Sequence, residues 1–380
     1  MIYLDNAATS WPKPGSVGKI MREALVRCGN PGRSGHKLSL DGGRVLLGCR
    51  EALAQYLHVA DPLSIIFCLN CTDGLNMAIK GLLPKGGHVV TTMLEHNAVL
   101  RPLGTLRQRG QVEFDAAPFN SFGQCTADVL EKLIRPNTRL AVLTHASNVT
   151  GIIQPLEEII PMFHRHGIPV VIDGAQSAGH IPLNLDNLGA DAYITAGHKG
   201  LLGPQGVGIM VLSSGCRPQT LREGGTGSSS LQLTQPQEMP DWYESGTPAT
   251  PAIAGLWSAV DFIARFEDVL VDQERQLRTQ LIQGLAAIKN LRLLTPVEAN
   301  IPGTGTVSFT LGSMDSSAVG DLLEERWGIA CRPGLHCAPL VHKAFGTEKN
   351  GAVRFSIGAF TTEREIHRAV SAVSVLARDA

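Results

Sequence analysis

The stretch TAGHKGLLGPQGVGIMVL, residues 195–212, places a single lysine among glycines and ends in an apolar run. Its final part, VGIMVL, is short and is followed by polar residues, which is typical of a buried strand. Lys199 itself comes directly after another apolar segment, DAYITAGH, and so lies near a strand end. Most lysines are solvated surface charges, and a surface lysine does not need several glycines around it. The stretch raises the hypothesis that Lys199 reaches into a pocket and reacts there.

Segments of the same kind occur throughout the first two thirds of the chain. Four further apolar runs are predicted strands: SIIFC (64–68), HVVTT (88–92), RLAVLTH (139–145) and PVVID (169–173). Helical patterns lie between or after them: DGLNMAIKGLL (73–83), TADVLEKLI (126–134) and LEEIIPMFHRHG (156–167). This alternation of strands and helices indicates an α/β fold with a mainly parallel sheet.

The pattern changes after about residue 250. A long helical stretch covers 252–289, and shorter strand and helix patterns follow at 305–311, 317–328, 352–358 and 363–377. This mixture indicates a second, smaller α+β domain. Before it, residues 224–240 are polar and rich in glycine. A flexible loop is the favoured interpretation of that segment, and a loop whose N–H groups cradle phosphate is the alternative.

The composition argues against several classes of partner. The chain has 380 residues, of which 43% are hydrophobic and 18% charged, and its net charge is −1. Without a basic field, we expect no binding to nucleic acid or to anionic membranes. No apolar run approaches the roughly 18 residues of a membrane span, and the opening MIYLDNAATS does not resemble a signal peptide. We therefore expect a soluble, cytoplasmic protein.

Eight cysteines are scattered along the chain without a disulfide framework, so they are expected to be reduced thiols. Cys68 and Cys71 have C-x-x-C spacing, but no second pair accompanies them. Zinc binding or redox chemistry is one interpretation of this pair, and packing at a strand end is the favoured one. We expect no metal site.

Polar residues gather where predicted strands end, which is where open parallel sheets bind ligands. These residues are Thr72, Asp73, His96, Asn148, Asp173 and Lys199. Taken singly, Thr72 and Asp73 can be helix caps, and His96 can be a capping or core histidine. Together the six combine an anion site, carboxylates, an imidazole, an amide and a lysine. Such a set suits an anionic, heteroaromatic cofactor that carries a carbonyl group.

Six motifs resemble, in order, those of the class V aminotransferase superfamily of fold-type I pyridoxal-phosphate enzymes. They are YLDNAATS (3–10), DGAQSAGHIPLN (173–184), GHKGLLGPQGVG (197–208), YESGTPAT (243–250), RPGLHCAP (332–339) and VRFSIGAFTTEREI (353–366). They extend essentially end to end and are most similar to the cysteine desulfurase and selenocysteine lyase branch. The resemblance implies a large domain over 15–250 that binds pyridoxal 5′-phosphate (PLP), and a small domain formed by 1–14 and 251–380.

The resemblance also implies cofactor contacts by position. Lys199 would hold PLP as a Schiff base, Asp173 would pair with the pyridine nitrogen, and Gln176 would hydrogen-bond the phenolic oxygen. His96 would stack on the ring and assist proton transfer, with Asn148 beside the ring and near the substrate. The implied phosphate contacts are Cys71, Thr72, Asp73 and His198, together with Thr247 of a partner subunit. That last contact implies a homodimer with shared active sites.

The substrate side follows from the same resemblance. Arg354 would hold a substrate carboxylate, His36 would line the substrate pocket, and Cys337 matches the nucleophilic cysteine of desulfurases. Arg332 and His336 are near Cys337 in sequence, and positive neighbours lower a thiol pKa. The implied reaction converts L-cysteine, or a related amino acid, to L-alanine through a persulfide on Cys337. A sulfur-acceptor protein would then take the sulfur.

Some residues depart from the branch. Leu335 stands where the short-loop (SUF-type) group has the first of two histidines. Ala196 replaces a serine that contacts phosphate, and Thr195 is its candidate substitute. Sixteen residues separate Cys337 from Arg354, a short span that is typical of the short-loop group. A selenocysteine lyase, or another class V lyase or aminotransferase, stays open as an alternative, and an inactive PLP-binding scaffold is a third.

Overall fold

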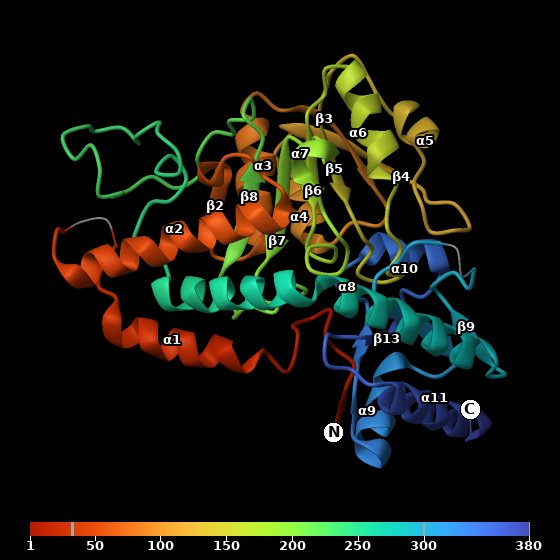
Figure 1. Ribbon diagram of the computed structural model, residues 1–380. Helices are drawn as coiled ribbons and strands as arrows, with labels where there is room; N and C mark the ends of the chain where they lie inside the picture. The colour runs from red at the N-terminus through yellow and green to blue at the C-terminus, as the bar shows by residue number, and fades with distance from the viewer. Residues whose placement is uncertain (32–33, 299–300, 380) are drawn as a thin grey trace.

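The computed structural model describes residues 1–31, 34–298 and 301–379. Figure 1 shows a central sheet with helices packed around it, and a smaller group of strands and helices at one side. The smaller group comes mostly from the blue C-terminal part of the chain, and the red N-terminus reaches it. Within the described residues, no helix has both the length and the apolar character needed to cross a membrane.

The elements follow one another from strand β1 to helix α11. In chain order they are β1 (Ile2–Tyr3), α1 (Gly15–Arg27), α2 (Lys37–Leu57), β2 (Ile65–Cys68), α3 (Cys71–Leu82), β3 (Gly87–Thr92), α4 (Asn97–Gln108), β4 (Val112–Ala117), α5 (Ala127–Glu131), β5 (Thr138–Thr144), α6 (Leu156–Arg165), β6 (Val170–Asp173), α7 (Leu185–Leu188), β7 (Ala192–Ala196), β8 (Gly208–Leu212), α8 (Thr250–Ala286), β9 (Leu291–Leu293), β10 (Thr306–Leu311), α9 (Ser316–Trp327), β11 (Ile329–Ala330), β12 (Arg332–Gly334), α10 (Pro339–Phe345), β13 (Ala352–Ser356) and α11 (Glu363–Asp379). Every strand and helix predicted from the sequence has a counterpart among them.

The main sheet has seven strands in the order β2-β8-β7-β6-β5-β3-β4. The neighbours from β7 to β4 all pair in parallel, which confirms a mainly parallel α/β sheet. Strand β8 departs from this pattern and runs antiparallel to both β7 and β2. Its direction has a simple reason, because no helix lies between the end of β7 at Ala196 and the start of β8 at Gly208. A parallel connection needs a dozen or more residues and usually a helix.

Both faces of the main sheet are buried, because successive side chains of a strand point to opposite faces. In β8, Ile209 and Val211 join one apolar cluster with α2, α6 and α8. Met210 and Leu212 join a second cluster with α3 and α4. Strands buried on both faces have nearly continuous apolar sequences. For this reason VGIMVL and the other strands stand out in the sequence as unbroken runs.

A four-stranded sheet, in the order β12-β13-β10-β9, is the centre of the smaller part. Its strands pair antiparallel, and it packs against α9, α11 and the second half of α8. Strand β1 pairs with β11, so the start of the chain lies against its C-terminal part. This pairing agrees with grouping 1–14 and 251–380, although the domain boundaries themselves stay a prediction. The segment 224–240 lies in a long connection without helix or strand between β8 and α8.

Gly208 begins β8 where the backbone of Asn70 packs against it. A Cβ on this residue would lie 2.3 Å from the Asn70 carbonyl carbon. We therefore expect Gly208→Ala to lower the free energy of unfolding by about 1–3 kcal/mol, because overpacking forces the backbone to move. Chemical denaturation measures this change. Gly215→Ala is the matched control, since no atom lies within 4 Å of its added Cβ, and equal stabilities of the two variants would contradict the prediction.

Candidate active site

A cavity at the carboxyl ends of the main-sheet strands brings together most of the predicted site residues. Together with the space at its open mouth, it has a volume of about 510 Å³. The residues that line it are Asn70, Cys71, Thr72, His96, Ala98, Thr144, Ala146, Asn148, Asp173, Ala175, Gln176, Ala196, His198 and Lys199. They come from the segments at or after the ends of β2, β3, β5, β6 and β7. The edge of the sheet expected to bind a ligand is therefore where they meet.

Lys199 lines this cavity from the turn that follows β7. Its pKa is lowered from the ordinary value, mainly because burial disfavours the charged ammonium. The nearby guanidinium of Arg354 lowers this pKa further, whereas Cys71 and Asp173 act in the opposite direction. A lysine that loses its proton readily can serve as a nucleophile or a base.

The turn that carries Lys199 is held by the N-terminal segment 5–13. The carbonyl oxygen of His198 accepts hydrogen bonds from the Ser10 N–H at 3.0 Å and from the Lys13 ammonium at 2.8 Å. The Ser10 hydroxyl donates to the Lys199 carbonyl at 2.9 Å. The backbone on both sides of the lysine side chain is thus tied to the start of the chain.

Two glycines near Lys199 permit close packing of its turn. A Cβ on Gly200 would lie 2.3 Å from the Ala178 carbonyl oxygen. A Cβ on Gly203 would lie 2.7 Å from Cδ1 of Leu256 in α8. The glycines of the stretch 195–212 therefore belong to a turn pressed between the loop after β6 and helix α8.

Asp173 ends β6 with a buried carboxylate that lines the cavity. Its Oδ1 accepts the Ala175 N–H at 3.0 Å and lies 3.6 Å from the Cys71 sulfur. Gln176 lines the same cavity, and its amide group donates to the Ala7 carbonyl at 2.9 Å. A carboxylate held in this way is suited to pair with a protonated ring nitrogen.

His96 is both a helix cap and a cavity residue. Its Nδ1 accepts the Ala98 N–H at 3.0 Å at the start of α4. Burial lowers the pKa of the ring to about 4, although Asp173 opposes this shift, so the imidazole is neutral at pH 7. Since Nδ1 is an acceptor, the single proton of the neutral ring is on Nε2. The capping bond therefore fixes both the orientation and the tautomer of a side chain that lines the cavity.

Helix α3 supplies an anion-binding end to the cavity. Its N-cap is Asn70, whose side chain accepts the Asp73 N–H at 2.9 Å, so the alternative that Thr72 or Asp73 is the cap is wrong. The N–H groups of Cys71 and Thr72 have no intrahelical partner, because they belong to the first turn. Near them, Nδ1 of His198 is buried without a hydrogen-bond partner among the described residues. The free N–H groups of a helix N-terminus suit a phosphate group, and the unpaired Nδ1 of His198 lies at the same cavity.

Two residues considered for the phosphate have other partners. The Asp73 carboxylate accepts the Leu69 N–H at 3.0 Å and pairs with Arg222, also at 3.0 Å. The Thr195 hydroxyl donates to the Gly174 carbonyl at 3.0 Å. Neither Asp73 nor Thr195 lines the cavity. The branch has a phosphate-binding serine at the position of Ala196. The Thr195 hydroxyl is bonded to the Gly174 carbonyl and so does not take the place of that serine in this structure.

Arg354 lies in β13, outside the lining of the cavity. Its Nη2 pairs with Oδ1 of Asp5 at 2.9 Å, and its Nη1 donates to the Asn148 carbonyl at 3.1 Å. Its Nε is buried without a partner among the described residues. The predicted substrate clamp is therefore held by Asp5 and linked to the cavity through Asn148, which does line it.

Cys337 lies beside the start of α4. Its carbonyl oxygen accepts the N–H of Asn97, the residue after His96, at 2.7 Å. Its side chain is half-exposed. The expectation that His336 adds positive charge near this thiol is wrong, because burial lowers the pKa of His336 to about 3 and leaves the ring neutral at pH 7. Arg332 remains as the positive residue close to it in sequence.

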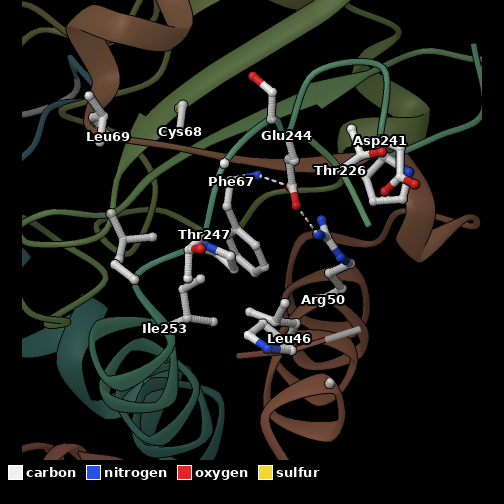
Figure 2. Close-up of a pocket in the computed structure, with 18 of the residues that line it drawn as sticks. Leu46, Arg50, Phe67, Cys68, Leu69, Thr226, Asp241, Glu244, Thr247 and Ile253 are labelled. Carbon is white, nitrogen blue, oxygen red and sulfur yellow. Dashed lines mark hydrogen bonds and ion pairs between the residues drawn. The ribbon is translucent and has the colours of Figure 1, made fainter. Parts of the chain in front are cut away.

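Thr247 and His36 lie away from this cavity. Figure 2 shows Thr247 in a second cavity, whose lining includes Arg50 and Glu244 joined as an ion pair. The loop 224–240 contributes to the second cavity and supplies no residue to the lining of the first. His36 is the N-cap of α2 and lines neither cavity. The structure therefore separates these two residues from the group around Lys199.

Cys68 and Cys71 are buried at the end of β2 and the start of α3. Cys68 donates from its sulfur to the Asn70 carbonyl at 3.4 Å. Burial raises the pKa of both thiols. Across 1–31, 34–298 and 301–379, no three histidine, cysteine or acidic side chains form a group that could hold a metal ion. Cys68 and Cys71 are thus buried thiols packed at the end of a strand.

Comparison with known proteins decides the family. The family model Aminotransferase class-V matches residues 2–369. The chain belongs to the class V aminotransferase family. A cysteine desulfurase of Yersinia pestis (strain Pestoides F) is 31% identical over 382 residues, covering 98% of this chain and 92% of that protein.

Solved structures of class V enzymes agree with this assignment. The apo structure of a cysteine desulfurase from Thermococcus onnurineus NA1 has a TM-score of 0.89 at 27% identity, and the match covers 100% of this chain and 95% of that one. The cysteine desulfurase CsdA (S-sulfonic acid) from Escherichia coli has a TM-score of 0.87 at 28% identity, covering 99% and 94%. The match to fold-type I enzymes therefore extends over both parts of the molecule.

Class V aminotransferases use PLP, and the residues of the cavity fit this cofactor. Lys199 offers an amine of lowered pKa, which suits the aldehyde. Asp173 offers a fixed carboxylate, which suits the ring nitrogen. The unpaired Nδ1 of His198 and the start of α3 suit the phosphate. The three kinds of group occur in one cavity, as a cofactor with an aldehyde, a basic ring and a phosphate requires.

Glu95, which the sequence analysis missed, lies directly before His96 and is fully buried. Its Oε1 accepts the Thr92 hydroxyl at 2.6 Å and the N–H of Thr144, a cavity residue, at 3.0 Å. Its Oε2 has no partner among the described residues. Burial raises the pKa of this carboxyl to about 8, so it keeps its proton at pH 7. A single glutamate between Leu94 and His96 gives no sign of such burial in the sequence.

The raised pKa of Glu95 makes stability depend on pH. The unfolded carboxyl ionises near pH 4.5, whereas the folded one keeps its proton up to about pH 8. The stabilisation is therefore complete below pH 4.5 and is lost as the pH rises, by at most about 1.4 kcal/mol per unit. Chemical denaturation between pH 5 and 8 should show a shallower decline for Glu95→Gln than for the wild type. The exposed Glu113→Gln is the control, and a Glu95→Gln decline that parallels the wild type would contradict the prediction.

Proposed function

We propose that this protein is a PLP-dependent cysteine desulfurase, which converts L-cysteine to L-alanine and passes the sulfur on through Cys337. The observation that carries the proposal is the position of Cys337, whose backbone is bonded to Asn97 beside the cavity residue His96. A partly exposed thiol therefore stands near the Lys199 cavity, where a transaminase would have no use for it. The relatives named above, which are cysteine desulfurases, support the same activity.

The proposed cofactor contacts follow the chemistry of the cavity. They are Lys199 to the aldehyde carbon, Asp173 to the ring nitrogen, Gln176 to the phenolic oxygen, His96 and Asn148 to the ring, and His198, Thr72 and the N–H groups of Cys71 and Thr72 to the phosphate. When bound, the protonated ring supplies an electron sink for negative charge at the substrate Cα. The lining of one cavity by all these residues supports the assignment.

The substrate carboxylate is the group that Arg354 is proposed to bind. A guanidinium suits a carboxylate because its donors form a planar fork. Asp5 already occupies one side of that fork, which keeps the guanidinium oriented, and the buried Nε is unpaired among the described residues. Asn148 links Arg354 to the cavity and is proposed to contact the substrate as well. For His36, at the start of α2, a place in the substrate pocket stays a prediction.

Lys199 and Cys337 are proposed to perform the two chemical roles. Burial lowers the pKa of Lys199, which favours the neutral amine, and its Nζ is proposed to take the proton from the substrate Cα. The Cys337 thiolate then attacks the substrate sulfur. The new S–S bond forms as the C–S bond breaks, and the electron pair of the C–S bond stays on carbon. Two protons then complete L-alanine: one reaches Cβ and balances the proton lost by the Cys337 thiol, and Lys199 returns the other to Cα. The sulfur stays on Cys337 as a persulfide until a thiol or an acceptor protein takes it.

A homodimer with shared active sites is part of the proposal. Thr247 lies in the second cavity, away from Lys199 of its own chain, so the phosphate it is proposed to reach belongs to a partner subunit (Figure 2). Leu47, Leu63 and Leu69 line this cavity with 48%, 42% and 60% of their surface exposed. Apolar groups gathered in this way favour an interface.

We propose that the enzyme acts in the cytoplasm. All eight cysteines are free, including the half-exposed Cys28, Cys331 and Cys337. Free thiols are typical of reducing compartments. A persulfide on Cys337 also needs a thiol or an acceptor protein nearby to complete the turnover.

Release of L-alanine from L-cysteine, with a reductant present, tests the proposal. We expect Cys337→Ala to keep the visible absorbance of bound PLP and to release no alanine, because only the sulfur acceptor is missing. Lys199→Ala should lose both the absorbance and the activity. Cys28→Ala, which changes another half-exposed thiol, should match the wild type.

Other outcomes of this experiment would favour the alternatives. Undiminished alanine release by Cys337→Ala would exclude the persulfide route. Activity on selenocysteine but not on cysteine would favour a selenocysteine lyase, since selenium is the better leaving group. Wild-type protein that stays colourless after addition of PLP would favour an inactive scaffold.

The phosphate contacts can be tested through the affinity for PLP. We expect Thr72→Val to weaken PLP binding by about tenfold, because a hydrogen bond to a charged group contributes roughly 1.5–3 kcal/mol. Thr195→Val is the matched control, since its hydroxyl faces the Gly174 carbonyl. Titration of apoprotein with PLP, followed by visible absorbance, measures both. A larger loss for Thr195→Val than for Thr72→Val would reverse the assignment.

A further inference from the structure

A chain of three buried side chains lies behind Cys337. Nε2 of His336 lies 2.9 Å from the Arg332 carbonyl oxygen, and its Nδ1 lies 3.2 Å from Nε2 of His342. Nδ1 of His342 lies 2.8 Å from the Thr347 hydroxyl. The exposed fractions of His336, His342 and Thr347 are 4%, 0% and 7%. The chain therefore runs from β12, through the loop that carries Cys337, to the residue after the C-cap of α10.

The contacts determine where each proton in this chain lies. A carbonyl oxygen only accepts, so Nε2 of His336 carries the proton and Nδ1 of the same neutral ring is an acceptor. Nε2 of His342 must then donate to His336, which leaves Nδ1 of His342 to accept from the Thr347 hydroxyl. Burial lowers the pKa of His336 to about 3 and that of His342 to about 4, so both rings are neutral at pH 7, as this pattern requires. Every donor therefore points towards Arg332.

The backbone in front of this chain is in a conformation that needs support. His336 and Cys337 have φ values of +50° and +55°. Side-chain-bearing residues rarely adopt this left-handed region, and two in succession persist only where neighbouring groups hold them. The carbonyl of His336 accepts the Asn148 amide at 2.6 Å, and that of Cys337 accepts the Asn97 N–H at 2.7 Å. These bonds hold the backbone, whereas the His336 side chain is held by the Arg332 carbonyl and by His342.

We propose that His342, through its hydrogen bond to His336, is a positioning residue that aims Cys337 at the substrate sulfur. This inference rests on the proposed desulfurase function. Among the described residues, the side chain of His342 bonds to His336 and Thr347, neither of which lines the cavity, so we expect it to act on Cys337 through His336. Its loss leaves Nδ1 of His336 without a donor, so that the bond from Nε2 to the Arg332 carbonyl is what then orients the ring. The loop 335–338 then loses one of the two side-chain bonds that support its left-handed geometry.

Two substitutions separate the hydrogen bond from the volume of the side chain. His342→Leu fills the space and removes the donor to His336. His342→Gln places an amide nitrogen near the position of Nε2 and restores that donor. We expect His342→Leu to lower kcat for alanine release by about 10- to 100-fold, because misplacing a reacting group by an ångström has effects of that size. His342→Gln should recover most of the loss.

The control is another buried histidine that has the same kind of partner. His88 is 0% exposed, and its Nδ1 lies 2.8 Å from the Thr138 hydroxyl, at the start of β3 and away from the cavity. His88→Leu should lower the melting temperature as His342→Leu does, without lowering kcat once folded. Equal losses of kcat in the two variants would show that His342 has a merely structural role.

Two readouts locate the effect at Cys337. The affinity for L-alanine, followed through the visible absorbance of bound PLP, should be the same in His342→Leu and wild type, because amino acid binding does not use the thiol. Alkylation of Cys337 by iodoacetamide, followed by mass spectrometry, should be faster in His342→Leu, because the freed loop exposes the sulfur. The inference would be overturned if His342→Leu kept both the alkylation rate and the kcat of the wild type. It would also be overturned if His342→Leu lost affinity for L-alanine by the same factor as it lost kcat.

The alkylation readout also keeps this inference distinct from the proposed function. If the wild type releases no alanine from cysteine, the desulfurase function fails, and the alkylation rates still decide whether His342 holds the Cys337 loop. If His342→Leu does not fold, Thr347→Val removes the last donor of the chain and keeps its shape. That variant should change kcat and alkylation in the same directions, by a smaller amount, and unchanged values would contradict the inference.

Discussion

The carbonyl oxygen of His198 is the point on which the arrangement of the site depends. Donors from segment 5–13 bind it and hold the turn of Lys199. The same segment carries Asp5, which pairs with Arg354 in the four-stranded sheet. One short piece of chain therefore fixes the reactive lysine of the large sheet relative to the smaller one. Bonds from Arg354 and from the Cys337 loop to Asn148 and Asn97 join the two parts as well.

Burial is the second constraint, because it decides which groups near the cavity are charged. It lowers the pKa of Lys199 and of the ring of His96, and it raises the pKa of Glu95. The neutral form is favoured in each case, since a charge loses hydration when it is buried. The Asp173 carboxylate is held in place by the hydrogen bond that it accepts from the Ala175 N–H. Burial therefore favours the neutral forms of these three groups near the Asp173 carboxylate.

The loop of Cys337 joins these two constraints. Its backbone is bonded to Asn97 and Asn148, which belong to the large sheet's carboxyl edge. Its side-chain anchor comes from α10, beyond the thiol in sequence. A nucleophile held by both parts of the molecule can keep a defined place while its own side chain stays half-exposed. A sulfur acceptor could therefore reach the Cys337 sulfur while the backbone of the loop stays fixed.

Much of the fold could be predicted from the sequence, for reasons that particular elements illustrate. The strands of the main sheet are buried on both faces and so have continuous apolar runs. Helices α1, α2 and α4 gave weaker signals and were not predicted. Glycines interrupt α2, and α4 contains Pro102 and Gly104, which lower helix propensity. Packing against α8 and α3 stabilises these helices, and a local pattern does not contain that contribution.

The sequence by itself determined which residues meet around Lys199, because parallel strands bring their carboxyl ends to one edge. His96, Asp173 and Gln176 could be named on that basis and on the motifs. Only the tertiary structure decided that Arg354 pairs with Asp5, that Glu95 keeps its proton, and that β8 runs antiparallel. Pairing across 349 residues and protonation by burial depend on which groups the folded chain brings together and removes from water. The spacing of residues along the sequence shows neither the distant pairing nor the degree of burial.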